Sequence, residues 1–284
     1  MLSFTLSAPA KINLFLHVTG RRDDGYHLLE SVFAPISLAD SVRLTLRADG
    51  RIRLLNPPDG LSETNDLACR AAQALQSATR TSLGVDIELA KHIPQGAGLG
   101  GGSSDAATAL LGLNRLWNLA VPRAELQSIG ATLGADVPFF VFGMPALARG
   151  VGEQLQAVTM PALHGVVASP GVAVATGPVF THPELKRDTP PLGASVFNLN
   201  FGRNDLQPVA IGLAPEIDRL CDAFVAAGAN PRMTGSGSCV FALAHHASHA
   251  HQLRVALGHA GWSAWAVHTL RRHPLYSLAD SATI

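Results

Sequence analysis

The segment Pro94–Ser104, with the sequence PQGAGLGGGSS, holds five glycines and two serines. Apolar alternation over 85–89 predicts a strand before it, and apolar residues at helical spacing predict a helix after it. Glycine lacks the Cβ that would keep backbone N–H groups away from a ligand, and a helix N-terminus offers unpaired N–H groups with partial positive charge. We therefore expect an anion cradle, with the hydroxyls of Ser103 and Ser104 as further contacts for a phosphate or magnesium. The alternative is a flexible turn with a helix cap, but a cap requires one residue and not five glycines.

Three common nucleotide-binding loops do not fit this segment. A P-loop needs a lysine after its glycines, and here serine follows. The dinucleotide pattern GxGxxG is met by Gly96, Gly98 and Gly101. However, no acidic residue lies between Asp105 and Glu125, where dinucleotide-binding domains place their ribose contact. A protein-kinase glycine loop leads into a strand that carries its lysine, whereas a helix is predicted here.

Together with two other segments, the loop resembles the GHMP kinases, named for galacto-, homoserine, mevalonate and phosphomevalonate kinases. Ser7–Leu14 (SAPAKINL) resembles the N-terminal motif of that family, and Met233–Phe241 (MTGSGSCVF) resembles its C-terminal motif. The resemblance implies a small-molecule kinase of the α+β class. It implies a two-lobed fold, with a ribosomal-protein-S5-like N-terminal lobe at 1–155 that binds ATP and a ferredoxin-like C-terminal lobe at 156–284.

The resemblance also implies the co-substrate, ATP, with Mg²⁺ carried on its phosphates. The family usually has an asparagine directly before the leucine of the helix at residue 67, near the adenine. Here the order is Asn65-Asp66-Leu67, so either Asn65 or Asp66 is the adenine contact. The residues implied for ATP are Asn65 or Asp66, and Pro94, Gln95, Gly96, Ala97, Gly98, Leu99, Gly100, Gly101, Gly102, Ser103 and Ser104.

Two further segments narrow the resemblance within the family. Arg21–His27 (RRDDGYH) and Gly134–Phe140 (GADVPFF) resemble the branch that phosphorylates the 2-hydroxyl of a cytidine-diphosphate-linked methylerythritol in non-mevalonate isoprenoid biosynthesis. A mevalonate- or homoserine-type kinase is the alternative enzyme, and the Gly-Tyr-His sequence at 25–27 argues against it. A non-catalytic nucleotide-binding regulator is a third hypothesis, and the presence of both Lys11 and Asp136 argues against it.

Lys11 and Asp136 are the residues to which the resemblance gives catalytic roles. Asp136 would accept the proton of the attacking hydroxyl, and Lys11 would offset charge on the transferring phosphoryl group. The residue pattern alone leaves other interpretations open. Asp136 precedes Val137 and Pro138 and so suits a helix or turn cap, and a lone lysine in a predicted strand is typical of a solvated edge.

The implied acceptor carries a cytosine ring and a diphosphate. Aromatic side chains stack well on such rings. The resemblance makes Tyr26 and Phe180 the stacking partners and His27 the hydrogen-bond reader of the ring. The other implied contacts line the erythritol and diphosphate path or lie near it: Asn13, Val151, Thr176 and Phe33.

Composition limits the remaining possibilities. The chain has 284 residues, 47% of them apolar and 15% charged, enough for a packed core in two lobes. Its 21 basic and 21 acidic residues cancel without a basic block, so we expect neither nucleic acid nor a membrane as a partner. Three scattered cysteines without a CxxC pair favour a reducing, cytoplasmic setting. The histidines between His245 and His251 suit a solvated helix face, so no metal site is expected, and the oligomeric state stays open between monomer and weak homodimer.

The elements that must position these residues alternate irregularly, which favours α+β over a parallel wound sheet. The strand at 51–55 is expected to pair with 41–47 as a hairpin, and the tail from Arg271 is expected to be peripheral or poorly ordered. Strands are predicted at 12–18, 41–47, 51–55, 85–89, 166–168, 239–243 and 264–267. Helices are predicted at 65–77, 105–117, 122–133, 215–227 and 249–257.

Overall fold

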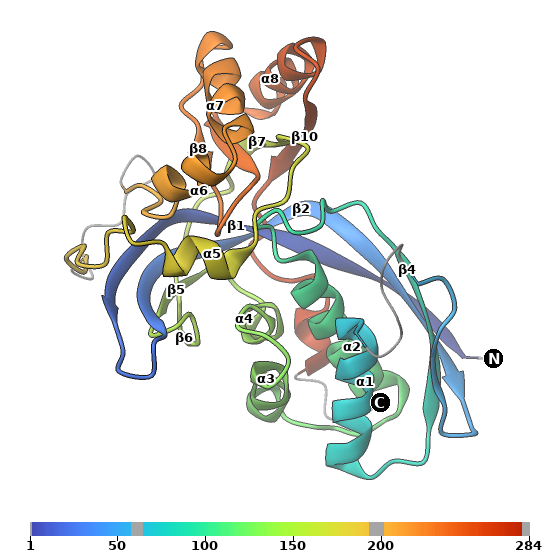
Figure 1. Cartoon of the computed structure of the whole chain (residues 1–284). Coiled ribbons are helices and arrows are strands. Elements are labelled where there is room, and N and C mark those ends of the chain that lie inside the picture. The colour runs from blue at the N-terminus through green and yellow to red at the C-terminus, as the bar shows by residue number, and fades with distance from the viewer. Residues whose placement is uncertain (1, 58–64, 193–201, 280–284) are drawn as a thin grey trace.

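The computed structural model describes residues 2–57, 65–192 and 202–279, and its strands form two separate sheets. In the larger sheet the strands run in the order β3-β4-β2-β5-β6, and β1 pairs with β2. Figure 1 shows this sheet with its helices below it and the smaller sheet above. The strands of the larger sheet are β1 (Ser3–Arg21), β2 (His27–Arg47), β3 (Ile52–Leu54), β4 (Gly84–Ala90), β5 (Ala146–Arg149) and β6 (Gln154–Ala157).

Strands β1 and β2 form a long antiparallel pair at the centre of the molecule (Figure 1). Its regular register is interrupted three times along β1, between Pro9 and Lys11, between Asn13 and Leu16, and between Val18 and Gly20. A β-bulge bends a strand and re-aims the neighbouring side chains. The first two interruptions lie beside Lys11 and Asn13, so they help to set the direction of these two predicted site residues.

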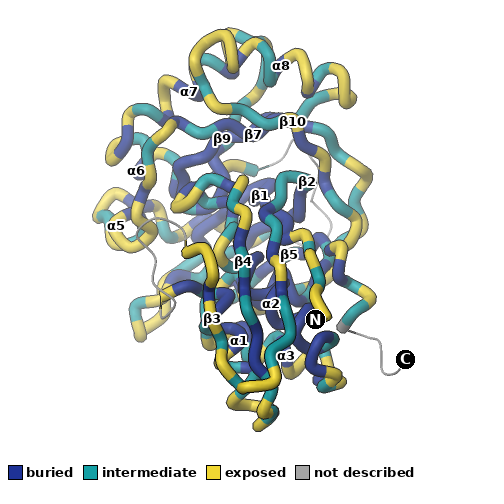
Figure 2. The backbone as a smooth tube through the Cα atoms, turned by 90° about the vertical axis from the view of Figure 1, so that its right-hand side faces the viewer, coloured by how far each residue is buried: buried dark blue, intermediate teal, exposed yellow. Residues whose placement is uncertain are grey.

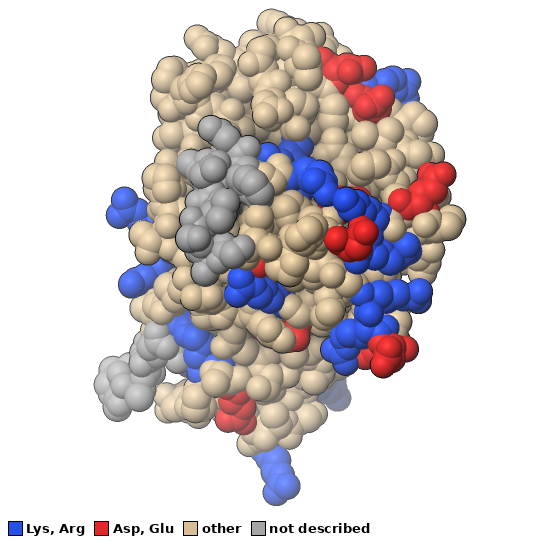
Figure 3. All heavy atoms as spheres, turned by 90° about the vertical axis from the view of Figure 1, so that its left-hand side faces the viewer, with Lys and Arg blue, Asp and Glu red and all other residues tan. Residues whose placement is uncertain are grey.

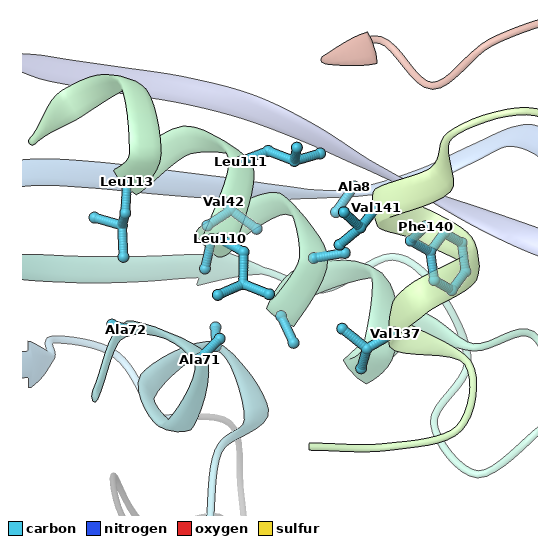
Figure 4. Packing of buried hydrophobic residues seen from close by; sticks show 14 of the residues in the cluster. Ala8, Val42, Ala71, Ala72, Leu110, Leu111, Leu113, Val137, Phe140 and Val141 are labelled. Carbon is cyan, nitrogen blue, oxygen red and sulfur yellow. The ribbon is translucent and has the colours of Figure 1, made fainter. Parts of the chain in front are cut away.

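Four helices cover one face of the larger sheet: α1 (Leu67–Thr79), α2 (Gly101–Leu116), α3 (Arg123–Ala131) and α4 (Val137–Phe142). Helix α2 is buried along most of its length, and a Cβ at Gly112 would lie 2.4 Å from Cδ1 of Leu6 on β1. The side chains of Leu6 and Leu44 therefore pack directly against the helix backbone at this glycine. Figure 4 shows the packing of Leu110 and Leu111 of α2 with Val137, Phe140 and Val141 of α4.

The second sheet runs β10-β7-β9-β8, and every pairing in it is antiparallel. Burial is concentrated along β1, β2, β7 and β9, whereas the outer faces of α7 and α8 are exposed (Figure 2). On the face drawn in Figure 3, basic and acidic side chains are interspersed. The elements that follow β6 along the chain are β7 (His164–Ser169), α5 (Thr176–Thr181), α6 (Gln207–Leu213), α7 (Glu216–Ala226), β8 (Arg232–Met233), β9 (Val240–Ala244), α8 (Ala247–His259), β10 (Ser263–His268) and the 3₁₀ turn η1 (Tyr276–Ala279).

The structure confirms the α+β class and most of the predicted elements, but the predicted hairpin is wrong. Strand β3 pairs in parallel with β4, with Ile52 opposite Val85, and β4 separates it from β2. A Cβ at Gly84 would lie 2.2 Å from the carbonyl oxygen of Arg51, so glycine is what lets the two backbones meet here.

The predicted peripheral tail is also wrong for the residues that the structure describes. His273 and Leu275 are buried, and the guanidinium of Arg123 on α3 lies 4.2 Å from the ring centroid of Tyr276. These contacts fasten η1 to the helices of the N-terminal part. The lobe boundary at residue 155 stays a prediction. None of the helices in the described ranges is long and apolar enough to cross a membrane.

Candidate active site

Two cavities meet at the glycine-rich loop 94–104. The smaller, of about 370 Å³, lies between this loop and the start of α1, and we call it the donor cavity. The larger, of about 650 Å³, extends from the loop towards residues 24–27 and α5, and we call it the acceptor cavity. Both are lined by Gly96, Gly98 and Ser103, so a molecule in one can meet a molecule in the other at these residues.

Helix α2 begins inside the glycine-rich segment, four residues before the predicted start at Asp105. Its N-cap is Gly100, at φ +72°, which supplies no side-chain capping bond. The first N–H groups of a helix have no partner within the helix. The start of this 16-residue helix thus leaves backbone donors and the positive end of its dipole beside the donor cavity, as an anionic ligand requires.

The glycine loop is held by the C-terminal motif. A Cβ on Gly98, which has φ +76°, would lie 2.2 Å from the carbonyl oxygen of Thr234, and a Cβ on Gly235 would lie 2.8 Å from the carbonyl oxygen of Gly98. The N–H of Cys239 donates to the carbonyl of Ala97 at 3.1 Å. Gly98 and Gly235 therefore allow the glycine-rich loop and the C-terminal motif to pack closely against each other, whether or not a ligand is bound.

Most of the residues predicted for ATP line the donor cavity, and two do not. Leu99 is buried in the core, and its carbonyl accepts the N–H of Lys11 at 3.0 Å. Ser104 is 0% exposed, and its hydroxyl donates to the carbonyl of Pro9 at 2.7 Å. The prediction that Ser104 contacts phosphate or magnesium is therefore corrected. Because α2 starts at Gly101, residue 104 falls on the buried face of the helix.

Asn65 and Asp66 both line the donor cavity, but their polar atoms are used differently. Asp66 is the N-cap of α1, and its Oδ1 accepts the N–H groups of Ala68 at 2.9 Å and Cys69 at 3.0 Å. Asn65 is exposed. The geometry thus leaves the amide of Asn65 freer to meet a base than the carboxylate of Asp66.

Sequence reasoning missed a buried charge cluster beside the donor cavity. The ammonium of Lys91 donates to Oδ2 of both Asp40 and Asp105, and Lys91 and Asp105 line the cavity. Asp40 also accepts the N–H of Ile93 at 2.8 Å. Oδ1 of Asp105 is buried without a hydrogen-bond partner among the described residues. These residues are far apart in sequence, and a lysine at the end of a predicted strand gives no local signal of such a cluster.

One ammonium shared by two carboxylates sets the proton affinities in this cluster. Burial raises the pKa of Asp105 to about 7, and the charge of Asp40 adds to the rise, while Lys91 opposes it. Burial lowers the pKa of Lys91, but the two carboxylates outweigh it and the net shift is upward. Lys91 therefore stays charged, and Asp105 changes its protonation near neutral pH.

Lys11 and Asp136 come together in the acceptor cavity. Nζ of Lys11 lies 3.5 Å from Oδ2 of Asp136, and both residues line the acceptor cavity. Lys11 is 3% exposed, so the solvated-edge interpretation does not hold. Asp136 stands at the start of α4, but its side chain makes no capping hydrogen bond to the described residues, so the cap interpretation is not supported either.

Asn13 positions the lysine. Its Oδ1 accepts a hydrogen bond from Nζ of Lys11 at 2.7 Å, and its Nδ2 donates to the hydroxyl of Ser31 at 2.8 Å. The N–H of Asn13 donates to the hydroxyl of Thr234 in the C-terminal motif at 2.9 Å. Nζ of Lys11 also lies 5.1 Å from the ring centroid of Phe33. Asn13 lines the cavity as predicted, but its amide is already occupied by neighbouring side chains.

The far end of the acceptor cavity carries the aromatic residues. Tyr26 is 65% exposed, next to Gly25 at φ +89° in a tight turn. The rings of His27 and Phe180 lie 5.2 Å apart at 38°. The hydroxyls of Thr176 and Ser236 lie 2.8 Å apart. All the residues predicted for the acceptor line this cavity: Asn13, Tyr26, His27, Phe33, Val151, Thr176 and Phe180.

His27 is held from behind by Arg187, a residue that sequence reasoning did not select. Nε of Arg187 donates to Nε2 of His27 at 3.0 Å. Burial lowers the pKa of His27, and the positive charges of Arg187 and Arg21 lower it further. The imidazole is therefore neutral at physiological pH.

The histidines near α8 play a local structural part. Nδ1 of His246 accepts the N–H of His249 at 3.1 Å and so caps the helix. The rings of His245 and His249 stack at 5.1 Å. Among the residues that the structure describes, no group of three or more potential ligands could hold a metal ion.

Comparison with known proteins agrees with the geometry. The family profile "GHMP kinases N terminal domain" matches residues 66–144, and "GHMP kinases C terminal" matches residues 182–263. A 4-diphosphocytidyl-2-C-methyl-D-erythritol kinase of Azoarcus sp. (strain BH72) is 50% identical to this chain, with 96% of each chain covered. The enzyme of that name from Thiobacillus denitrificans (strain ATCC 25259 / T1) is also 50% identical, over 97% of this chain and 98% of its own.

Two solved structures are similar to this chain, one in sequence and fold and the other in fold alone. A 4-(cytidine 5'-diphospho)-2C-methyl-D-erythritol kinase superposes with a TM-score of 0.81 at 40% identity, covering 94% of this chain and 99% of its own. A mevalonate kinase superposes with a TM-score of 0.67 at 13% identity, covering 95% and 100%, and so shares the fold. The chain belongs to the GHMP kinases and, within them, to the family of 4-diphosphocytidyl-2-C-methyl-D-erythritol kinases.

Proposed function

We propose that this chain transfers the γ-phosphoryl group of ATP to the 2-hydroxyl of 4-diphosphocytidyl-2-C-methyl-D-erythritol, giving the 2-phosphate and ADP in non-mevalonate isoprenoid biosynthesis. Relatives with that name are 46–50% identical over nearly the whole chain. The observation that carries the proposal is the Lys11–Asp136 pair, at 3.5 Å, in the acceptor cavity, which shares Gly96, Gly98 and Ser103 with the donor cavity.

The donor cavity suits the triphosphate. Backbone N–H groups at the start of α2 would bind phosphate oxygens, and the helix dipole would add to the attraction. Ser103 lines both cavities, so it is the serine we assign to the phosphates and to the Mg²⁺ that accompanies them. Magnesium, when bound, would neutralise charge on the β- and γ-phosphates. We assign the adenine contact to Asn65, because Oδ1 of Asp66 is already bonded to two N–H groups of α1.

The transfer step requires positioning and charge neutralisation more than covalent chemistry. The 2-hydroxyl oxygen attacks the γ-phosphorus while the bond from that phosphorus to the β,γ-bridging oxygen breaks, and ADP leaves. The carboxylate of Asp136 takes the hydroxyl proton. The ammonium of Lys11, fixed by Asn13, offsets the charge on the transferring group and orients the Asp136 carboxylate.

The acceptor cavity suits the rest of the substrate. It is lined both by the reacting pair and by aromatic residues, of which Tyr26 and Phe180 would stack on the cytosine, and His27 would bond to the edge of that ring. Thr176 and Ser236 would meet the diphosphate between these ends. Three glycines also line the same cavity: Gly25, Gly177 and Gly235.

A panel of acceptors tests this assignment. The protein would be incubated with ATP, Mg²⁺ and each of the cytidylyl substrate, mevalonate and homoserine, and ADP release would be measured. We expect turnover with the cytidylyl substrate alone. Turnover on mevalonate but not on the cytidylyl substrate would contradict the acceptor assignment. ATP binding without transfer to any acceptor would favour a regulator over an enzyme.

A further inference from the structure

Arg187 does not line the acceptor cavity but lies directly behind one of its walls. Its guanidinium makes four hydrogen bonds: Nε donates to Nε2 of His27 at 3.0 Å, and the two terminal nitrogens donate to the carbonyls of Phe180, His182 and Leu185 at 2.7–3.0 Å. His27 and Phe180 both line the cavity. Arg187 therefore reaches the substrate only through these residues.

The direction of the bond to His27 fixes where the imidazole carries its proton. An arginine side chain has five N–H donors and no acceptor, and it stays protonated in proteins. Nε2 of His27 must therefore present a lone pair to Arg187. In a neutral imidazole one ring nitrogen is the donor and the other the acceptor, so the proton is on Nδ1.

We propose that Arg187 fixes the proton of His27 on Nδ1 and thereby sets a preference of the acceptor cavity for cytosine over uracil. The inference rests on the proposed function, since it concerns how the same site selects its base. The N3 atom of cytosine is unprotonated and accepts a hydrogen bond, which a fixed Nδ1–H donor satisfies. Uracil carries a proton on N3, so the same donor would face another donor, and a buried unmatched polar pair weakens binding.

The surroundings of His27 hold this arrangement over the ordinary pH range. The charged groups that act on the imidazole are Arg187 and Arg21, both positive, and burial acts in the same direction. All three oppose a second proton on the ring. The ring of Phe180, 5.2 Å away, is apolar and offers no competing acceptor.

The kinetic test compares the cytidylyl substrate with its uridylyl counterpart. In Arg187→Met, the ratio of kcat/KM for the two substrates should fall about 10- to 100-fold, through KM rather than kcat, with KM for ATP unchanged. Arg187→Lys retains a charged donor and should keep most of the preference. Arg219→Met is the matched control, because Arg219 is exposed on α7 and pairs with Glu216.

A purely structural role for Arg187 makes a different prediction. If it only anchors the segment from Phe180 to Leu185, Arg187→Met would raise KM equally for both substrates and leave the ratio unchanged, which would overturn the proposal. The double variant His27→Asn/Arg187→Met shows whether Arg187 acts through His27 or through the segment from Phe180 to Leu185. When His27 is absent, loss of Arg187 should have no further effect on the ratio.

The tautomer can be read without turnover. In ¹⁵N spectra of the full-length protein, with the His27 signals assigned from His27→Asn, we expect Nδ1 to be protonated in the wild type and both tautomers to be populated in Arg187→Met. Protonation on Nε2 in the wild type would overturn the proposal. A wild type that turns over neither substrate would instead contradict the proposed function, and the spectra would still decide the position of the proton.

Discussion

The donor and acceptor cavities meet at Ser103 but are built in different ways. One continuous segment, 93–103, forms most of the donor cavity, and it does so largely with backbone. The acceptor cavity takes side chains from residues between Lys11 and Ser236, which lie on β1, β2, α5 and several loops. Phosphate binding can therefore be encoded by local spacing of glycines, whereas recognition of the acceptor exists only once distant segments are folded together.

The difference also decides how each site should respond to mutation. Backbone donors cannot be removed by substituting a side chain. Mutations in the donor cavity should therefore weaken ATP binding only when they change the backbone conformation of the loop. Side chains in the acceptor cavity can be removed one at a time, so each substitution should remove one contribution to acceptor binding or turnover. The predictions below test this contrast, from the largest expected effect to the smallest.

Asp136→Asn should lower kcat by about 10²–10⁴-fold while leaving ATP affinity near normal, because the amide cannot accept the hydroxyl proton. Steady-state kinetics and ATP titration measure both quantities. Asp24→Asn is the matched control: Asp24 lines the same cavity but forms an exposed pair with Arg22 at 2.6 Å, and its loss should change kcat by less than about threefold. An unchanged rate for Asp136→Asn would remove that residue from the reaction.

Gly98→Ala should lower the free energy of unfolding by about 2–4 kcal/mol and weaken ATP binding with it, because the new Cβ would clash with the carbonyl of Thr234 at a positive φ. Gly102→Ala, four residues along, is the control. A Cβ there lies 3.5 Å from Leu67, an ordinary contact, so stability should be nearly unchanged. Chemical denaturation and ATP titration of both variants decide the matter. Equal effects of the two substitutions would contradict an interlocked loop.

Tyr26→Ala should raise KM for the cytidylyl substrate about 5- to 30-fold, since stacking on a base contributes about 1–2 kcal/mol. Tyr26 is 65% exposed, so the unfolding midpoint should not change. Tyr26→Phe keeps the ring and should behave like the wild type. A loss of stability, or an equal loss in Tyr26→Phe, would mean that stacking is not the role of this side chain.

Asp105→Asn should alter the pH dependence of stability by about 1.4 kcal/mol between pH 6 and pH 8. The pKa of Asp105 rises from its usual 3.8 to about 7 in the folded state, so the folded protein holds this proton more tightly than the unfolded chain. The stability from that proton is complete below about pH 4 and is lost as the pH rises through 7.

The variant at residue 105 cannot ionise, so it should be stabilised relative to the wild type more at pH 8 than at pH 6, as read from denaturant unfolding at each pH. Asp66→Asn is not a suitable control because the charge of Asp66 itself raises the pKa of Asp105. Asp86→Asn, which loses a surface pair with Arg47, provides the comparison. Parallel pH profiles for wild type and Asp105→Asn would show that Asp105 is ionised throughout.

The sequence predicted the donor cavity better than the acceptor cavity for a physical reason. Glycine spacing and the following helix are local features, and both are visible in the printed residues at 94–117. The acceptor residues were reached only through a family resemblance, because no local rule brings Lys11 to Asp136 or Tyr26 to Phe180. Arg187 and the Lys91 cluster were missed for the same reason, since Arg187 lies 160 positions from His27 and Lys91 lies 51 and 14 positions from its two carboxylates.

Errors in the predicted elements also have identifiable causes. Starting α2 at Asp105 instead of Gly101 left Ser104 in a loop, free to bind a ligand, whereas one more helical turn places it on the buried face. The hairpin prediction for 51–55 used the turn at Asp49 and Gly50 but could not see that β4 offers an edge there. The tail was expected to be peripheral because nothing local shows that Arg123 holds Tyr276.

The most direct test of the account is a crystal structure of the protein with a non-hydrolysable ATP analogue and the cytidylyl substrate bound together. We predict that the phosphates lie on the N–H groups at the start of α2, that the 2-hydroxyl oxygen is within hydrogen-bonding distance of the Asp136 carboxylate, and that the cytosine lies between Tyr26 and Phe180. A cytidylyl group bound on the glycine loop, or a 2-hydroxyl out of reach of Asp136, would contradict the division of the site into a donor and an acceptor cavity.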